Sequence, residues 1–434
     1  MLVTESMIGS RRKSSHSSAL SAGYRLLCGL LMGLAFLLAG CPEDAAGAEY
    51  RIQPSITLGE EYEDNVFLTP NNKQDDFITR IIPAVVFAYR TGFWSWDMDF
   101  AYDYRKYLKG TRTEDSTYRL NLRNRTILID NLLFFEAQDQ YQRVSLDVTK
   151  DYTQQSLFVN QSDENVLTLN PYVATRLGSG SKMNFGFKYV NYQYTDPSAI
   201  DNVDHIAYLE TLSELSSNTT FSTGIRYTRG QNHVIDYYKT DVYAGPRYAY
   251  APNSYVYCLL GETWVDFAGF PQTKHLLWDL GFFHRYSTMS LAVETKTDTV
   301  PDPTRIWTRV DQLEATLTRE TATRTAISVI AGWYEYRSAE TNHLENTAYR
   351  LSGTLRHVLS PTLTISGEID NRRLFDYTTS VATYVYEGGV SLERRFLADL
   401  TATFAYWYVN SYSPDDYIQN YVNNRLSAEL TYRF

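Results

Sequence analysis

Residues 94–105 read WSWDMDFAYDYR, and apolar and polar side chains alternate along the whole segment. The even positions carry only Trp, Met, Phe and Tyr, whereas four of the six odd positions carry a charge. Side chains of a β-strand point to opposite faces with a period of two, so this pattern indicates a strand with one apolar and one charged face. On a helix the same residues would scatter around the cylinder. In the folded protein, one face of the sheet must therefore contact an apolar environment and the other face must contact water or polar groups.

This segment is also long for a strand of a soluble sheet. It extends over 12 residues, whereas strands of soluble proteins usually hold about five or six. Aromatic residues occupy both ends of its apolar face, as is typical of strands whose ends lie at the two membrane interfaces. The pattern predicts a strand that crosses a membrane.

The same alternation returns along the chain to its last residue, and it is poor only in a few segments such as 325–337. Counting the segments gives about 20 strands, with 18 as the alternative. We therefore predict an all-β protein, a transmembrane antiparallel up-and-down β-barrel over residues 51–434. Clear examples of the alternation are 183–189, 221–228, 313–318, 349–356 and 363–370.

The connections between these segments alternate between tight turns and longer polar stretches, which is the pattern of outer-membrane barrels. An even number of strands leaves both chain termini in the periplasm, as export requires. Residues 146–162 form the longest polar stretch, and we expect them to fold into the lumen or to bind at the surface. Tight turns are expected near 91–92, 130–131, 178–180, 251–253, 321–323, 360–361 and 397–399. Longer loops are expected at 64–75, 108–116, 195–203, 298–304, 339–342, 376–379 and 412–417.

Composition excludes two other classes of protein. The mean hydropathy is −0.35 although aromatic residues make up 15% of the chain. A bundle of transmembrane helices needs several apolar runs of about 18 residues or more, whereas this chain has only one strongly apolar run, of 13 residues. The formal net charge of −10 argues against nucleic acid as a partner, because phosphate binding requires clustered Lys and Arg.

That apolar run lies near the N-terminus, where residues 26–38 read LLCGLLMGLAFLL after a basic region. A run of this length after basic residues is typical of a signal peptide. Residues 38–41 form a lipobox, which predicts a signal peptide over residues 1–40 and lipidation of Cys41. The alternative is ordinary cleavage after Ala48, because Ala46-Gly47-Ala48 matches the A-x-A pattern.

Cleavage before Cys41 leaves residues 41–50 as a short periplasmic segment ahead of the barrel. It removes four basic residues and one acidic residue, so the formal net charge changes from −10 to −13. Only Cys41 and Cys258 then remain. A lipidated Cys41 leaves no disulfide framework, and we expect hydrogen-bonded closure of the barrel to provide stability instead.

The last nine residues, LSAELTYRF, alternate as a strand and end in Phe. Apolar side chains occupy one face, and this arrangement resembles the signal that the outer-membrane assembly machinery recognises. We predict that Leu430, Tyr432 and Phe434 form this assembly signal. The predicted location is the bacterial outer membrane, with its lipid and its assembly machinery as partners.

Two segments carry a resemblance to a known family. Residues 60–68 read EEYEDNVFL, and after a polar loop residues 76–83 read DFITRIIP. This beginning resembles the β-barrel porin-2 family of outer-membrane proteins, which are often associated with bacterial exopolysaccharide systems. The resemblance implies a role in envelope transport, with polysaccharide and periplasmic export proteins as partners. Asp64 and Asn65 are equally well explained as a turn between strand and loop.

If the aromatic faces contact lipid, the opposite faces line the lumen. Their charged side chains either form ion pairs that brace the wall or line a wet channel of mixed charge. Trp407 breaks the outward aromatic pattern and is placed to stack on a sugar ring. The candidate lumen residues are Asp97, Asp99, Asp103, Arg105, Arg119, Arg123, Arg125, Lys188, Arg226, Glu314, Arg350, Arg356, Glu368 and Asp370.

The sequence offers little support for catalysis. Its seven His residues are dispersed, and the motifs of zinc and serine hydrolases do not occur. Asp204-His205 stands alone without a nucleophile placed beside it. We predict no enzyme, no metal site and no cofactor. The predicted function is porin-like passage, or help in the export, of a hydrophilic solute, with exopolysaccharide as the expected solute. The alternative is a non-conducting structural or surface-binding barrel.

Overall fold

The computed structural model describes residues 48–149, 159–321, 324–416 and 420–434. The predicted signal peptide and Cys41 lie outside these residues. None of the residues in the described ranges forms a helix long and apolar enough to span a membrane. From Glu49 onward the chain folds into strands joined by turns and loops, and the first strand begins two residues before the predicted start of the barrel.

The strands follow one another without interruption by any other element in the described ranges. The first ten are β1 (Glu49–Glu63), β2 (Asp76–Arg90), β3 (Trp94–Tyr107), β4 (Asp115–Ile129), β5 (Leu133–Ser145), β6 (Gln161–Arg176), β7 (Ser181–Tyr194), β8 (Asn202–Ser216), β9 (Thr219–Asn232) and β10 (Tyr237–Ala251). The others are β11 (Ser254–Phe267), β12 (Thr273–Tyr286), β13 (Met289–Asp302), β14 (Ile306–Thr321), β15 (Thr325–Ser338), β16 (Leu344–Ser360), β17 (Leu363–Asp376), β18 (Val381–Arg395), β19 (Leu400–Tyr412) and β20 (Tyr421–Arg433).

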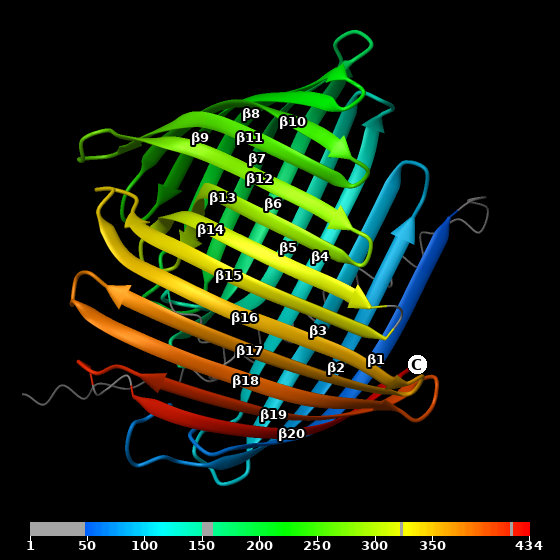
Figure 1. The fold of residues 1–434 in the computed structure, drawn as a ribbon, viewed down its shortest axis with the longest axis vertical. Helices are drawn as coiled ribbons and strands as arrows, with labels where there is room; N and C mark the ends of the chain where they lie inside the picture. The colour runs from blue at the N-terminus through cyan, green and yellow to red at the C-terminus, as the bar shows by residue number, and fades with distance from the viewer. Residues whose placement is uncertain (1–47, 150–158, 322–323, 417–419) are drawn as a thin grey trace, which may run out of the picture. The chain divides into compact units, whose positions relative to one another are not determined.

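Each strand pairs antiparallel with its neighbours in sequence, and β1 pairs with β20 (Figure 1). This last ladder runs from Ser55 opposite Arg433 to Glu63 opposite Arg425. The strands therefore form one closed sheet without a free edge strand. The predicted all-β up-and-down barrel is confirmed, with 20 strands and not 18.

The two-residue period determines which side chains face outward. Phe185 on β7, Ile369 on β17 and Phe404 on β19 all expose more than half of their surface. Their neighbours in sequence are polar or small, and they face the interior. The segment that first indicated the fold, WSWDMDFAYDYR, lies in β3 as expected.

The two ends of the barrel differ in their connections. At one end, which we call the turn end, the strands are joined by two to four residues, and β1 begins and β20 ends there. At the other end, the loop end, connections reach fifteen residues, between β5 and β6. Short turns therefore alternate with longer loops, as the sequence predicted.

Two ladders stop before they reach the loop end. Pairing between β12 and β13 ends at Asp279 opposite Lys296, although β12 extends to Thr273 and β13 to Asp302. Pairing between β4 and β5 ends at Leu120 opposite Tyr141. Every other ladder among the described strands continues to the loop end.

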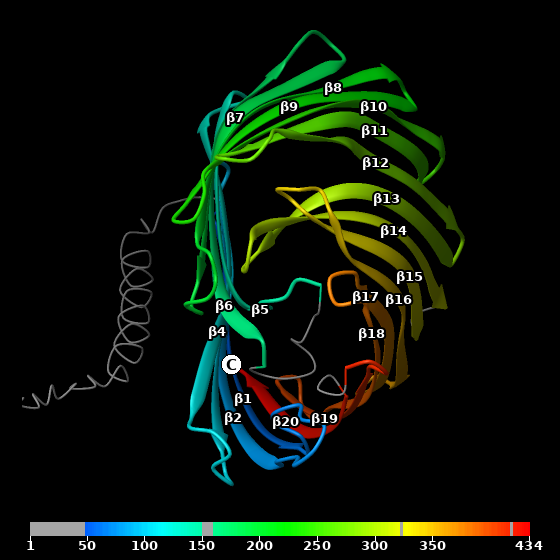
Figure 2. The same cartoon turned by 90° about the vertical axis from the view of Figure 1, so that its left-hand side faces the viewer.

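At the first of these gaps, the loop end of β13 and β14 turns inward (Figure 2). The Lys239 ammonium on β10 donates a hydrogen bond to Thr299 Oγ1 on β13 over 3.0 Å. The ring of Trp307 on β14 lies 6.2 Å from that of Tyr237 on β10 and 5.7 Å from that of Phe267 on β11. These partners lie three or four strands apart around the barrel, so the β13–β14 hairpin packs against the inner surface of β10 and β11.

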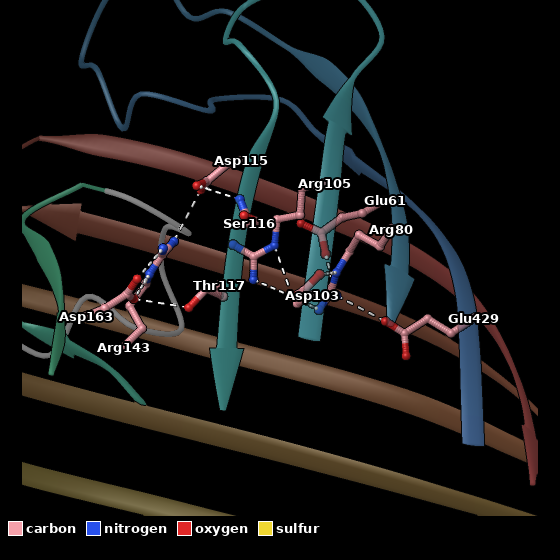
Figure 3. Close-up of polar contacts among 10 residues, drawn as sticks. All are labelled: Glu61, Arg80, Asp103, Arg105, Asp115, Ser116, Thr117, Arg143, Asp163 and Glu429. Atoms are coloured by element: carbon pink, nitrogen blue, oxygen red, sulfur yellow. Dashed lines mark hydrogen bonds and ion pairs between the residues drawn. The ribbon is translucent and has the colours of Figure 1, made fainter. Parts of the chain in front are cut away.

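The gap between β4 and β5 is bridged by side chains (Figure 3). The Arg143 guanidinium on β5 lies 3.3 Å from the carboxylate of Asp115 on β4 and 2.8 Å from that of Asp163 on β6. Thr117 on β4 donates a second hydrogen bond to Asp163 over 3.1 Å. Ionic contacts thus replace the missing backbone ladder.

Candidate functional site

The seam that closes the barrel carries a network of charged side chains (Figure 3). The Arg80 guanidinium on β2 lies 2.8 Å from the carboxylate of Asp103 on β3, 3.1 Å from that of Glu429 on β20 and 3.6 Å from that of Glu61 on β1. Arg105 reaches Asp103 over 2.6 Å. Four consecutive strands across the seam are therefore joined by one network. Asp103 and Arg105, which the sequence placed in the lumen, brace the wall.

Asp64 and Asn65, from the segment that carried the family resemblance, also hold this seam. Asn424 on β20 donates its amide hydrogen to the Asp64 carboxylate over 2.6 Å. The Asn65 amide donates to the backbone carbonyls of Val422 and Thr69. Asn65 is completely buried. These contacts fix the β1–β2 loop on the last strand, which is a structural role at the strand-to-loop turn.

Most of the other predicted lumen charges are also paired. The Arg350 guanidinium lies 2.7 Å from the Asp370 carboxylate, in the shortest of these pairs. Contacts of this kind brace a wall more than they line an open path. The remaining contacts are Asp97 with Arg90, Asp99 with Arg119, Arg125 with Glu136, Arg226 with Glu210, Glu314 with the Tyr334 hydroxyl, and Lys188 over the Tyr208 ring.

Three of the predicted residues differ from the rest. In the part of the chain that the structure describes, Arg123, Arg356 and Glu368 form no ion pair and no side-chain hydrogen bond. Arg123 lies on β4, far around the wall from the other two. Arg356 and Glu368 lie on the adjacent strands β16 and β17.

Arg356 and Glu368 share one cleft on the inner wall. Its volume is about 270 Å³, and Trp407 on β19 forms one side of it. Trp407 lies flat over Gly389, where a Cβ atom would be only 2.5 Å from the indole ring. The structure thus brings together two predicted charges and the tryptophan that breaks the outward pattern. Hydroxyl side chains complete the lining, from Thr318, Ser328, Thr354, Ser366 and Ser391.

The chemistry of this cleft suits a polyhydroxylated ligand. An indole face packs against the C–H face of a sugar ring. Hydroxyl, guanidinium and carboxylate groups together offer both donors and acceptors to sugar hydroxyls. Arg356 and Glu368 are available for this because neither is neutralised by a neighbour.

The inner wall also carries tyrosines, which sequence reasoning had placed mainly on the lipid-facing side. Tyr243 donates its hydroxyl hydrogen to Glu210 over 2.8 Å, and its ring covers Gly224. The period of two contains this signal, because Tyr243 shares a face with Asp241 and alternates with outward Val242. The other hydroxyl–carboxylate contacts are Tyr172 with Glu136, Tyr194 with Glu164, Tyr237 with Asp204, Tyr257 with Asp279 and Tyr334 with Glu314.

Apolar contacts cover the lumen at the loop end. Trp307 is 6% exposed and packs with Tyr237, Val265 and Phe267. The tip of the β13–β14 hairpin reaches the β7–β8 loop, where the Ile200 amide donates to the Pro303 carbonyl over 2.7 Å. The described part of the chain therefore places a folded hairpin across this end of the lumen.

A second apolar cluster lies on the opposite side of the loop end. Leu68 of the β1–β2 loop packs with Val409 on β19 and Tyr421 on β20. Val159 and Val385 contact the same cluster. Residues 150–158 of the predicted 146–162 loop, which precede Val159, lie outside the described ranges.

The predicted assembly signal lies at the end of β20. Leu430 and Tyr432 face outward on β20, and the Phe434 amide donates to the Pro54 carbonyl over 3.0 Å. In the β1–β2 loop, a hydrogen bond from Lys109 lowers the pKa of Asp75. No group of His, Cys, Asp and Glu in the described residues has the arrangement of a metal site.

Comparisons with known proteins support the fold and leave the family open. No family model matches the chain, and no curated protein matches it. Among solved structures, the ferric enterobactin receptor PfeA of Pseudomonas aeruginosa superposes with a TM-score of 0.54 at 10% identity, over 89% of this chain and 81% of that one. The siderophore receptor PirA of Acinetobacter baumannii gives 0.53 at 7% identity, over 88% and 80%. The fold is that of bacterial outer-membrane barrels, and the apolar outer face places the chain in that membrane.

Proposed function

We propose that this protein is a gated transport barrel that passes a hydrophilic solute of the saccharide class across the outer membrane. The observation that carries the proposal is the lumen cleft in which unpaired Arg356 and Glu368 lie beside Trp407. Export of exopolysaccharide, periplasmic export partners and the porin-2 family remain predictions of the sequence resemblance. The solved receptors support the fold alone.

The β13–β14 hairpin supplies the gate in this proposal. Its loop end has no backbone ladder to β12, and it is held to the inner wall by Trp307 and the Lys239–Thr299 hydrogen bond. Side-chain contacts of this kind break at far lower cost than a ladder of backbone hydrogen bonds inside a membrane. Release of the hairpin would open the loop end without opening the wall.

A disulfide that fixes the hairpin tip tests the gate. Ile200→Cys with Pro303→Cys joins residues already held by a backbone hydrogen bond, and this proximity suits disulfide geometry. Both substitutions are made in a Cys258→Ser background, which removes the one described cysteine. In planar bilayers we expect no conductance after oxidation and recovery of channel events after reduction.

The matched control is a disulfide within an intact ladder. The Oγ1 atoms of Thr211 on β8 and Thr223 on β9 lie 2.6 Å apart, so Thr211→Cys with Thr223→Cys should not alter conductance. A reduced, fully folded barrel that never conducts would contradict transport and support the structural or surface-binding alternative. Equal conductance before and after oxidation of the hairpin pair would contradict the gate.

The solute class is tested by blocking the reduced channel with a neutral glucan hexasaccharide. Arg356→Gln removes one side of the cleft and should raise the half-blocking concentration about tenfold, as expected for loss of one hydrogen bond from a charged donor. Arg123→Gln is the control, because Arg123 is also an unpaired arginine but lies outside the cleft. Absence of block, or equal effects of both variants, would refute a saccharide site here.

A further inference from the structure

The outer wall carries a groove that the transport proposal does not use. Its volume is about 600 Å³, and it crosses the lipid-facing surface from β13 to β18. Its lining is mostly apolar, with Leu313 and Leu351 half-exposed toward the membrane. A concave apolar surface on a barrel wall is suited to lipid chains.

One charged residue lies in this apolar lining. Arg373 on β17 shares the outward face with Ile369, which is 54% exposed. Its guanidinium lies over the ring of Tyr384, with Cζ 5.8 Å from the ring centre. Arg373 forms no ion pair and no hydrogen bond among the described residues. An arginine that faces lipid without a counter-ion in the protein requires an anion or water from outside.

A second polar donor lies beside it. Asn371 is two residues earlier on the same face, and its amide likewise has no hydrogen-bond partner in the described part of the chain. Tyr349 and Tyr386 contribute hydroxyl groups to the same groove, and Trp333 contributes an indole N–H. The groove therefore combines a cation, several neutral donors and an apolar floor.

The height of Arg373 along the strand identifies the environment. It lies three residues before Asp376, where β17 ends at the loop end, and after the apolar outward residues Ile365 and Ile369. Aromatic residues surround it, as in the girdle that marks a membrane interface. An even number of strands places both chain termini on the periplasmic side, and both lie at the turn end. The loop end therefore faces the exterior, and Arg373 lies at the headgroup level of the outer leaflet.

We propose that this groove binds a phosphate-bearing, acylated glycolipid of the outer leaflet, of the lipid A type. The phosphate accepts hydrogen bonds from the Arg373 guanidinium, which presents paired donors. The sugar accepts hydrogen bonds from Asn371 and the tyrosine hydroxyls, and the acyl chains lie on Leu313 and Leu351. This site is on the opposite face of the wall from the saccharide cleft and does not depend on transport.

Native mass spectrometry of the purified barrel with added lipid tests this site. Bis-phosphorylated lipid A should remain bound after mild activation, whereas Arg373→Gln should reduce the retained fraction about tenfold. Arg394→Gln is the control, because Arg394 is also an outward arginine over an aromatic ring, that of Phe396, but at the turn end. Unchanged mobility of unboiled samples on gels shows that each variant is folded.

Three outcomes would overturn the proposal. Equal retention of lipid A by the Arg373→Gln variant and the parent barrel would show that Arg373 does not contribute to binding. Equal retention of lipid A from which both phosphates have been removed would exclude phosphate recognition. Equal competition by phosphatidylethanolamine or phosphatidylglycerol would show a general phospholipid surface. Because no readout involves conductance, these outcomes leave the transport proposal untouched.

Discussion

The Arg80 guanidinium on β2 lies 3.1 Å from the Glu429 carboxylate on β20, and β1 runs between the two strands. A side-chain contact therefore crosses the strand that closes the barrel. The same guanidinium contacts Asp103 on β3 and Glu61 on β1 (Figure 3). One cation thus joins three carboxylates across the closing strand, in addition to the backbone ladder.

Replacing Arg80 should weaken this closure. Arg80→Leu leaves Glu61 and Glu429 without their cation and Asp103 with Arg105 alone, in a site where the arginine is only 18% exposed. We expect a loss of about 3 kcal/mol in the free energy of unfolding, in the range seen when one partner of a buried ion pair is removed. Urea unfolding of the refolded barrel, followed by gel mobility, measures it.

Arg90→Gln provides the comparison, because the Arg90–Asp97 pair is more than half exposed on both sides. Its loss should cost about 1 kcal/mol or less. Similar midpoints for the Arg80 and Arg90 variants would show that the network at the seam does not support closure.

Gly389→Ala should disturb the lumen cleft directly. The added Cβ would be 2.5 Å from the Trp407 ring, so the ring must move, at a cost of about 1–3 kcal/mol. We expect weaker block by the glucan hexasaccharide and a shifted tryptophan emission. Gly367→Ala is the control on β17, where the nearest atom lies 3.8 Å away. Equal block of both variants by the glucan hexasaccharide would show that the position of Trp407 does not affect binding in the cleft.

Trp307→Ala should release the β13–β14 hairpin. The side chain packs among Tyr237, Val265 and Phe267, and truncation of such a buried tryptophan costs about 3–5 kcal/mol. The expected result is faster amide hydrogen exchange in 297–302 and more frequent channel openings. Trp333→Ala, on the outer face, should change neither. Protected amides in the Trp307 variant would show that the hairpin is held by other contacts.

Asp76→Ala should free the β3–β4 loop. The buried Asp76 carboxylate accepts hydrogen bonds from the amides of Lys109 and Thr111 and from the Thr111 hydroxyl. Without these acceptors we expect rapid proteolysis within 108–114 in intact vesicles. Asp75→Ala removes exposed contacts with Lys109 and Tyr62 and should leave the loop protected. Equal cleavage of both variants would contradict this anchoring role.

The two-residue period predicted the barrel correctly because it records which face of each strand contacts lipid. It could not reveal the bend of β14. Leu313 and Leu317 face outward, and Trp307, Arg309 and Asp311 continue the same odd positions. Their surroundings are nevertheless internal, because the hairpin curls beneath β10 and β11. Periodicity shows which residues share a face of the strand. It does not show where the strand bends and brings that face into the barrel interior.

The candidate site was predictable in part for a related reason. Arg356, Glu368 and Trp407 could each be assigned to the lumen from alternation alone. Which of the fourteen charged candidates remain unpaired depends on cross-strand register, and a slip of one residue would exchange every partner. Alternation does not determine which residues lie opposite one another on adjacent strands. The cleft could therefore be identified only from the strand pairing in the structure.

The two shortened ladders give the barrel different mechanical properties at its two ends. At the turn end, backbone hydrogen bonds form an uninterrupted hoop whose circumference is fixed. At the loop end, the same wall consists of two arcs, β5–β12 and β13–β4 by way of β20 and β1. Among the described strands no ladder joins the two arcs there, and they are held together by side chains such as Arg143 and by the backbone hydrogen bond from Ile200 to Pro303. When these contacts break, the aperture at the loop end can widen, while the turn end keeps its circumference and the membrane seal.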